Sequence, residues 1–273
     1  MSPPPADLQS RLSCLGPAVL RRLQRGLEKE SLRVRPDGAL AMTPHPEGLG
    51  SALMHPRITT DFSESQVEMI TGVHEDIAAC LQQLTEIHQI VLEQIGDELL
   101  WCTSMPCRLP PDDRIPIGQY GRSNVGRTKT VYRVGLKNRY GSRMQTISGL
   151  HYNFSLPAHA WDLLPAPAGL EADSKARRNA GYFSLIRNFR RDSWLLLVLF
   201  GASPVVCRSF VDGTPHRLGF AIGNEFSDHV TERSNYLYLA HSKLRACAIG
   251  PELRTGALPR DLRGTSRIPV SST

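Results

Sequence analysis

Residues 27–34 read LEKESLRV and lead directly into RPDG at residues 35–38, and this stretch decides the fold. In such a turn the proline fixes one φ angle, and the glycine accepts the positive φ that closes the turn. We therefore expect a strand over 27–34, a tight turn, and a short second strand over 39–42. Periodicity predicts three further strands, at 57–62, 65–71 and 144–156.

Helical patterns lie between and after these strands. The clearest covers 76–95, with Asp76 as N-cap and an apolar stripe formed by Ile77, Leu81, Leu84, His88, Val91 and Ile95. On this stripe we interpret His88 as a core or boundary histidine rather than as a ligand. A helix interrupted at Gly16-Pro17 is predicted over 7–24, a loop over 102–131, and a long helix over 176–200 whose apolar end, WLLLVLF, should be buried.

The composition is that of an ordinary globular chain. Of 273 residues, 41% are hydrophobic and 21% are charged, which excludes disorder throughout. No apolar run approaches the roughly 18 residues of a membrane span, and the first residues, MSPPPADLQSRLSCLG, lack the apolar core of a signal peptide. We therefore expect a cytoplasmic protein with no membrane partner, whose six cysteines, none in a CxxC pair, are reduced thiols.

A net charge of +6 raises the question of nucleic-acid binding. The 32 basic residues include no run of five or six cations, and the densest cluster, RNFRR at 187–191, falls on a predicted helix. No nucleic-acid partner is therefore expected. A basic nucleic-acid binder is the least favoured of the function classes.

Two carboxylates stand close together in the predicted strand over 27–34. Glu28 and Glu30 are two residues apart, so their side chains would project to the same face, about 7 Å from each other. Like charges at this separation are unfavourable unless they are solvated or bridged by a cation. The pair therefore indicates either an exposed edge strand or one wall of a cation-binding cleft.

Further candidate ligands follow in two segments. Asp61, Glu64 and Glu68 could share the face of a solvated helix; alternatively, Asp61 ends one strand and Glu68 lies in the next, and both point into the cleft with Glu28 and Glu30. His151 shares strand parity with Gln145, Ile147, Gly149, Asn153 and Ser155. That largely polar face indicates a lined cavity or an outer sheet face, whereas Leu150, Tyr152 and Phe154 form an apolar face.

These residue types favour a hard divalent cation. Several carboxylate oxygens suit Mg²⁺ or Mn²⁺, which commonly bridge the phosphates of a substrate to a few protein carboxylates. A histidine ligand is less usual for Mg²⁺ and leaves room for Mn²⁺. The sequence has no GxxxxGK[ST] motif, and GRTKT at 126–130 lacks its spacing, so any bound ATP is not held by a P-loop.

These residues lie in segments that resemble the proteobacterial glutamate–cysteine ligase (gamma-glutamylcysteine synthetase) family. The similar segments keep the family's order from about Leu12 to Phe210: QRGLEKESLRV (24–34), HPEGLGSALMHPRITTDFSESQVEMIT (45–71), QYGRSNVGRTKTVYRVGLKNRYG (119–141), MQTISGLHYNFSLP (144–157) and GYFSLIRNFRRDSWLLLVLFGASP (181–204).

The resemblance implies an α+β fold similar to that of glutamine synthetase, in which a curved antiparallel sheet lines a cleft and helices pack outside. It implies ATP-dependent ligation of the L-glutamate gamma-carboxyl to L-cysteine through a gamma-glutamyl phosphate, the first step of glutathione biosynthesis, with Mg²⁺ or Mn²⁺. By position, Glu28, Glu30, Asp61, Glu68 and His151 resemble metal ligands, and Tyr132, Arg133 and Gln145 resemble substrate contacts. The reaction needs no protein nucleophile.

The resemblance also sets an expected domain boundary. Residues 1–213 resemble the N-terminal part of the family's catalytic domain, in this chain a monomer if it folds. Residues 214–273 are a divergent tail that we expect to be poorly ordered towards its end. Members of the family continue beyond this length, and their second half supplies another metal carboxylate and part of the nucleotide and cysteine pockets. The alternative to an active ligase is therefore a non-catalytic fragment or a vestigial binding protein.

Overall fold

The computed structural model describes most of the first 211 residues and five short strands after them. The described residues are 13–106, 108–165, 169, 174–200, 207–211, 219–220, 223–225, 247–249, 253–255 and 266–268. Within this part of the chain, no helix is both long and apolar enough to cross a membrane. The four cysteines whose state the structure describes, Cys14, Cys80, Cys102 and Cys207, are free thiols.

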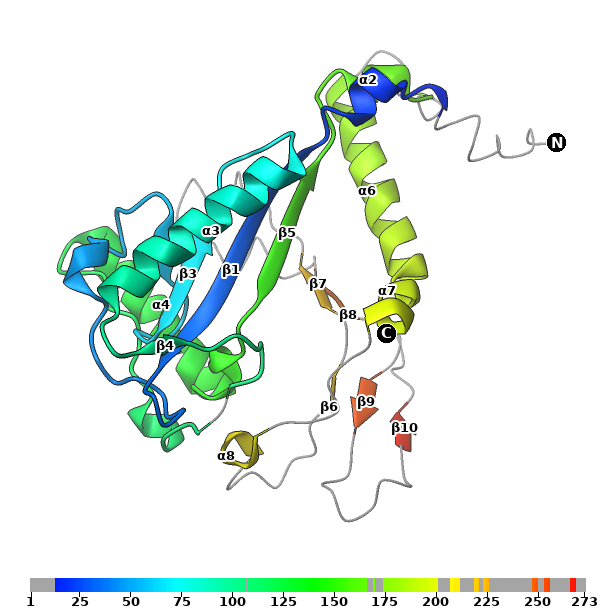
Figure 1. The fold of residues 1–273 in the computed structure, drawn as a ribbon. Helices are drawn as coiled ribbons and strands as arrows, with labels where there is room; N and C mark the ends of the chain where they lie inside the picture. Colours follow the sequence, from blue (N-terminus) through cyan, green and yellow to red (C-terminus); the bar gives the residue numbers. More distant parts are fainter. Residues whose placement is uncertain are drawn as a thin grey trace.

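One long strand, β1 (Gln24–Val34), forms the centre of a five-stranded sheet. On one edge it pairs with β3 (Gln66–Ile70), which in turn pairs with β2 (Ile58–Thr60). It also pairs with β5 (Leu150–Ser155) and, at its end, with β4 (Leu99–Leu100). All of these pairings are antiparallel, which confirms the predicted sheet type (Figure 1).

The turn after β1 forms as its sequence predicts, but the strand expected after it does not. Gly38 has a φ of 79°, and its N–H donates to the Arg35 carbonyl at 2.8 Å. Residues 39–42 contribute only an isolated bridge between Leu40 and Val34, so this predicted strand is wrong. The helix predicted over 7–24 is also wrong at its end, because among residues 14–24 only α2 (Pro17–Leu20) is helical and β1 begins at Gln24. Residues 7–12 of this prediction lie outside the described part of the chain.

Helix α3 (Ile77–Gln94) covers one face of the sheet, where it lies across β1 and β3 (Figure 1). The predicted cap is confirmed, since Asp76 Oδ1 accepts the Ala79 N–H at 2.7 Å. The buried residues of α3 include Ile87 and Val91, which pack against Val67 and Met69 of β3.

The predicted apolar stripe of α3 is buried only in its second half, where Val91 and Ile95 belong to the core and Leu84 packs against it. Ile77 and Leu81 are more than half exposed, whereas Cys80, which was not on the stripe, is buried. His88 is half-buried and its Nδ1 lies 2.8 Å from the Leu84 carbonyl oxygen, as expected of a boundary histidine.

Helix α4 (Asn124–Tyr140) corrects the loop predicted over 102–131. The helix has few apolar residues and two glycines, so no apolar stripe marks it in the sequence. Its N-terminus is nevertheless capped, because Ser123 Oγ accepts the Gly126 N–H at 3.1 Å. Short 3-10 turns lie elsewhere: η1 (Glu47–Leu49), η2 (Asp112–Arg114) and η3 (Met144–Thr146).

The chain beyond β5 forms α5 (Ala160–Leu163), α6 (Ser174–Asp192), α7 (Trp194–Phe200) and α8 (Arg208–Val211). The single helix predicted over 176–200 is therefore interrupted at Ser193. Its apolar end is not buried, because Trp194, Val198 and Leu199 are all more than half exposed. In the view of Figure 1, β5 runs between α3 and α6.

Five short strands follow: β6 (Gly219–Phe220), β7 (Gly223–Glu225), β8 (Cys247–Ile249), β9 (Leu253–Thr255) and β10 (Ser266–Ile268). They form one sheet in the order β10-β9-β6 and a separate β7-β8 pair. Most other residues of 214–273 lie outside the described part of the chain, so the divergent, poorly ordered tail stays a prediction.

Candidate functional site

Strand register places four of the five predicted ligands on one face of the sheet. Glu28 and Glu30 are two apart in β1 and so project to the same side. Glu30 is paired with Glu68 of β3, and Glu28 is paired with His151 of β5. Directly opposed residues of an antiparallel pair share a face. Glu68 lies between Val67 and Met69, which pack against α3. The face that carries the four ligands is therefore the one away from α3.

Two alternative interpretations of these residues are now excluded. β1 is not an exposed edge strand, because it is paired with β3 on one side and with β5 on the other. Asp61, Glu64 and Glu68 do not share a helix, because Asp61 follows β2, Glu64 lies in the connection, and Glu68 lies within β3.

Both carboxylate oxygens of Glu28 are bound by side chains of β5. Its Oε1 accepts the Asn153 amide at 2.9 Å, and its Oε2 lies 3.1 Å from His151 Nδ1. This contact with Glu28 is the largest cause that raises the pKa of His151 to about 9, against the opposing effect of burial, with Glu30 adding to the rise. His151 is therefore protonated at neutral pH when no cation is bound, and its N–H donates to Glu28.

One oxygen of Glu30 is held by two donors. Its Oε2 accepts the Gly149 N–H at 2.8 Å and the Gln66 side-chain amide at 3.1 Å. Burial and the nearby charge of Asp61 raise the pKa of Glu30 to about 7, although the Gly149 hydrogen bond opposes the shift. Glu30 is thus a partly buried carboxylate whose negative charge lacks sufficient compensation in the protein itself.

The pKa of Glu68 is raised in the same way, and the nearby charge of Asp61 explains part of the shift. Burial, followed by the charges of Asp61 and Glu30, raises the pKa of Glu68 to about 8. Because Asp61 affects the pKa of both glutamates, it belongs to the same electrostatic cluster even though it lies just outside β2. The structure therefore places four predicted ligands on one sheet face, with Asp61 close enough to act electrostatically on two of them.

Asp61 is positioned through its backbone by residues from two other segments. Its carbonyl oxygen accepts hydrogen bonds from Arg133 Nε of α4 and from the Tyr120 hydroxyl, the latter at 3.0 Å. Its N–H donates to the Gln66 carbonyl at 3.1 Å. The Arg133 guanidinium also stacks over the Tyr120 ring at 4.5 Å, which fixes α4 next to the end of β2.

The three predicted substrate contacts have different surroundings. Arg133 is buried, and much of its guanidinium binds carbonyls of Lys129, Thr60 and Asp61. Tyr132 is half-buried on α4. Gln145 is half-buried in the 3-10 turn η3, so the strand predicted over 144–156 begins too early, and the strand parity expected between Gln145 and His151 is wrong.

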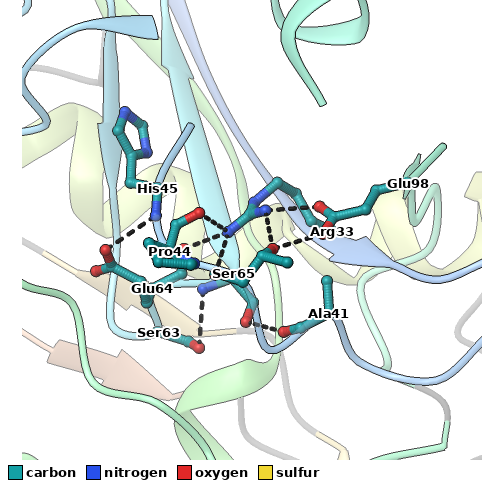
Figure 2. A network of polar contacts seen from close by, with 9 residues as sticks. Arg33, Ala41, Pro44, His45, Ser63, Glu64, Ser65 and Glu98 are labelled. Atoms are coloured by element: carbon teal, nitrogen blue, oxygen red, sulfur yellow. Dashed lines mark hydrogen bonds and ion pairs between the residues drawn. The ribbon is translucent and has the colours of Figure 1, made fainter. Parts of the chain in front are cut away.

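A buried arginine holds the connection between Asp61 and β3 (Figure 2). Arg33 is 1% exposed; its Nη1 donates to Glu98 at 2.6 Å, and its Nη2 donates to the Thr43, Pro44 and Glu64 carbonyls. The Glu64 carboxylate accepts the backbone N–H groups of His45 and Gln119, so Glu64 fastens loops. This network holds together the loops that lead into β3 next to the site.

Two residues of this arrangement were missed in the sequence. Gln66 shares strand parity with Glu68 inside the predicted 65–71 strand, so that parity could have placed it beside Glu30. Arg33 gives no such signal, because its partners Glu98 and Thr43 come from distant segments that only the fold brings together.

The donor set suits a divalent cation, although the side chains do not enclose one as they stand. Among the described residues, no three His, Cys, Asp or Glu side chains lie in a geometry that could hold a metal ion. Four carboxylates and an imidazole are nevertheless appropriate ligands for Mg²⁺ or Mn²⁺. A Cβ added at Gly149 would lie 2.9 Å from His151 Nε2 and 3.4 Å from Glu30 Oε1, so glycine keeps the space beside both atoms open.

Comparison with known proteins gives one consistent family. The glutamate–cysteine ligase family model matches residues 14–252. Glutamate–cysteine ligase of Pseudomonas putida W619 is 53% identical over 213 residues, covering 77% of this chain and 41% of the relative. The enzyme of Pseudomonas paraeruginosa PA7 is 47% identical over 248 residues, covering 89% of this chain and 45% of the relative. The chain therefore spans less than half the length of these curated relatives.

Two solved structures are similar in fold and sequence. Glutamate–cysteine ligase of Francisella tularensis, crystallised in complex with AMP, has a TM-score of 0.62 and 38% identity, covering 72% of this chain and 38% of that one. A bifunctional glutathione synthetase from Pasteurella multocida has a TM-score of 0.65 and 34% identity, covering 76% of this chain and 26% of that one. In both cases the match is to a part of a longer protein.

Proposed function

Because this chain belongs to the glutamate–cysteine ligase family, we propose that it supplies the carboxylate-lined part of an ATP-dependent active site. The reaction joins the gamma-carboxyl of L-glutamate to the amine of L-cysteine through a gamma-glutamyl phosphate, the first step of glutathione biosynthesis. The observation that carries the proposal is the convergence of Glu28, Glu30, Asp61, Glu68 and His151 beside one sheet face. The AMP complex of the Francisella tularensis structure supports a nucleotide substrate.

The five clustered residues are proposed to hold Mg²⁺, or Mn²⁺ in view of the histidine. Bound there, the ions would neutralise the phosphates of ATP and orient the transferring phosphoryl group. The raised pKa values of Glu30 and Glu68 support this role, because crowded carboxylates favour a cation over mutual repulsion. His151 would have to release its proton and part from Glu28 to act as a ligand, since a metal binds the neutral imidazole.

Residues of α4 and η3 are proposed to bind substrate next to the carboxylates. Tyr132 and Arg133 belong to the helix that adjoins Asp61, and Gln145 precedes the segment whose Gly149 holds Glu30. A cation such as Arg133 would steady a substrate carboxylate or the transferring phosphate. Phosphorylation itself activates the glutamate carboxyl for attack by the cysteine amine, so no protein nucleophile takes part.

We further propose that the protein is cytoplasmic, and that it is a monomer once further polypeptide covers the exposed apolar residues of β5 and α7. The free thiols of the described cysteines and the use of ATP support that location.

A second candidate function, a non-catalytic fragment, is favoured by an exposed apolar surface. Leu150, Tyr152 and Phe154 on β5 are 64%, 60% and 40% exposed. They belong to the face that α3 covers elsewhere, because Leu150 and Tyr152 pair with Lys29 and Leu27 of β1. Together with the coverage of 41% of a relative, this surface supports the proposal that these residues act together with further polypeptide.

Activity with and without added polypeptide distinguishes the two functions. The purified chain is supplied with ATP, Mg²⁺, L-glutamate and L-cysteine, and both phosphate release and dipeptide formation are measured. The same assay is repeated after co-expression with the part of the Pseudomonas putida enzyme that follows the matched region. We expect turnover to be negligible for the chain alone and to rise to an ordinary enzymatic rate, about 1–1000 per second, in the complemented sample.

Two variants control this assay. Glu68→Gln should abolish the restored turnover, whereas Glu86→Gln, which lies on α3 away from the cluster, should leave it unchanged. Restored turnover that survives Glu68→Gln would contradict the proposed ion site. A complemented sample that forms a stable complex without turnover would instead favour the non-catalytic function.

A further inference from the structure

Gln66 is buried beneath the carboxylate cluster in an orientation that apolar packing does not explain. The first residue of β3, it is fully buried, and its amide nitrogen lies 3.1 Å from Glu30 Oε2. The same nitrogen is 3.4 Å from both the Ile147 carbonyl oxygen and Ser148 Oγ. Among the described residues, its carbonyl oxygen Oε1 is buried with no hydrogen-bond partner.

An unpaired buried carbonyl oxygen lowers stability, so a residue that only filled this space would better be apolar. Glutamine leaves that oxygen unpaired but provides an N–H donor that contacts Glu30. The assignment of nitrogen and oxygen follows from this contact, because the reverse orientation would place the amide oxygen against a carboxylate. Departures from good local packing of this kind are expected at functional sites.

The geometry around Glu30 separates the roles of its two oxygens. Oε2 is held by the Gln66 amide and by the Gly149 N–H, while the Glu30 backbone N–H donates to the Gly149 carbonyl at 3.0 Å. Oε1 instead lies on the side of Gly149 that faces His151 Nε2, where any Cβ at position 149 would intrude. One oxygen is thus fixed to the protein, and the other faces the shared space of the cluster.

We propose that Gln66 and Gly149 are positioning residues that hold Glu30 by Oε2 so that Oε1 is presented to a divalent cation. The role rests on the proposed ion site and adds to it the two residues that orient one of its ligands. Outer residues that orient a metal ligand by hydrogen bonding contribute about 10–100-fold to metal affinity. Neither Gln66 nor Gly149 needs to touch the ion.

The test is the affinity of the purified full chain for Mn²⁺, measured at one fixed pH by electron paramagnetic resonance of the free ion. Gln66→Met preserves the length and packing of the side chain but removes the donor, and it should weaken Mn²⁺ binding about tenfold or more. The matched control is Gln82→Met. Gln82 also donates to a glutamate, Glu86, at 3.1 Å, but on the exposed face of α3. This control should bind Mn²⁺ as tightly as the wild type.

A double-mutant cycle separates positioning from a merely structural role. In a Glu30→Gln background, Gln66→Met should weaken Mn²⁺ binding no further, within about twofold, because Gln66 acts through Glu30. Wild-type affinity in Gln66→Met, or an equal loss in both backgrounds, would overturn the positioning role while leaving the ion site intact. Failure of the wild type to bind Mn²⁺ would overturn the proposed ion site itself, and the positioning role with it.

Gly149→Ala keeps the proposal falsifiable if Gln66→Met does not fold, as judged by circular dichroism. The added methyl group would occupy the space between Glu30 Oε1 and His151 Nε2. This variant should also lose about tenfold in Mn²⁺ affinity. Part of the loss should persist in the Glu30→Gln background, because the methyl group would also lie 2.9 Å from His151 Nε2. A Gly149→Ala chain that binds Mn²⁺ as the wild type does would overturn the proposal.

Discussion

At the scale of one residue, Glu68 shows that a binding-site side chain can lower the stability of the metal-free chain. It lies among the carboxylates of Asp61, Glu30 and Glu28 and is largely removed from water, so its ionised form is disfavoured in the metal-free chain. The pKa of Glu68 is raised in the folded state, and folding therefore takes up a proton. The cost of ionising Glu68 is absent below about pH 4.5, grows as the pH rises, and is complete above about pH 8.

Glu68→Gln should therefore stabilise the metal-free chain. Above pH 8 we expect a gain on the order of 1–3 kcal/mol in the free energy of unfolding, because a neutral isostere removes the buried charge. The gain should shrink towards zero as the pH falls to 4.5, where Glu68 of the wild type is already largely protonated. Urea unfolding at several pH values, with Glu86→Gln as the exposed control, measures it. A loss of stability at high pH would show that another cation already compensates Glu68.

At this scale, strand parity predicted part of the site and no more. Glu28 and Glu30 could be placed on one face because two residues of one strand are enough to define it. The contact between Glu28 and His151 depends on the register of β1 against β5, which no single segment encodes. Gln145 was misplaced because β5 pairs with β1 only as far as Lys29, and the end of β1 pairs with β4 instead, which no single segment encodes.

At the scale of elements, the Arg33 network holds the segments that carry the site. Arg33 is 1% exposed and its ion-pair partner Glu98 is 14% exposed, so both charges are largely removed from water (Figure 2). Truncating one member leaves the other charge buried and uncompensated.

Arg33→Met should lower the free energy of unfolding by about 3–5 kcal/mol, as expected when a buried ion pair loses one partner. The exposed pair of Arg35 with Asp37 provides the control, and Arg35→Met should cost less than about 1 kcal/mol. Denaturant unfolding monitored by circular dichroism measures both changes. Similar small losses in the two variants would mean that solvent reaches Arg33 and screens its charge.

Helix α4 offers a matched pair of glycines for a second test. At Gly126 an added Cβ would lie 2.2 Å from the Tyr120 carbonyl oxygen, whereas at Gly135 the nearest atom would be 3.8 Å away. Gly135→Ala should therefore stabilise the chain by up to about 1 kcal/mol through helix propensity. Gly126→Ala should destabilise it, because backbone atoms must move apart. Thermal unfolding of the two variants should shift in opposite directions; equal shifts would contradict the close packing.

The elements that sequence reasoning missed share a physical cause. Periodicity detects an apolar stripe, and α4 has none, since it is attached through Arg133 and through the close approach of Gly126. The apolar run at 194–200 was wrongly predicted to be buried, since much of α7 is exposed. A wholly apolar segment is buried only where another part of the protein packs on it.

At the scale of the whole molecule, the exposed apolar residues of β5 and α7 predict that the isolated chain self-associates. Burying this surface is favourable, and apolar patches left in water promote aggregation. We expect light scattering of the purified chain to show concentration-dependent assembly. Co-expression with the remaining part of the Pseudomonas putida enzyme should yield a defined complex instead. A chain that stays monomeric at high concentration would show that this surface needs no further cover.

The central claim, that Glu28, Glu30, Asp61, Glu68 and His151 form a divalent-cation site, is tested most directly by locating the ion. Crystals of the chain, alone or with its complementing polypeptide, are soaked in Mn²⁺, and anomalous diffraction is recorded at the manganese edge. We predict an anomalous peak beside the face of β1 that carries Glu28 and Glu30, at about 2.0–2.6 Å from carboxylate oxygens of the cluster. A peak elsewhere, or none at this face in ordered crystals soaked with Mn²⁺, would contradict the claim.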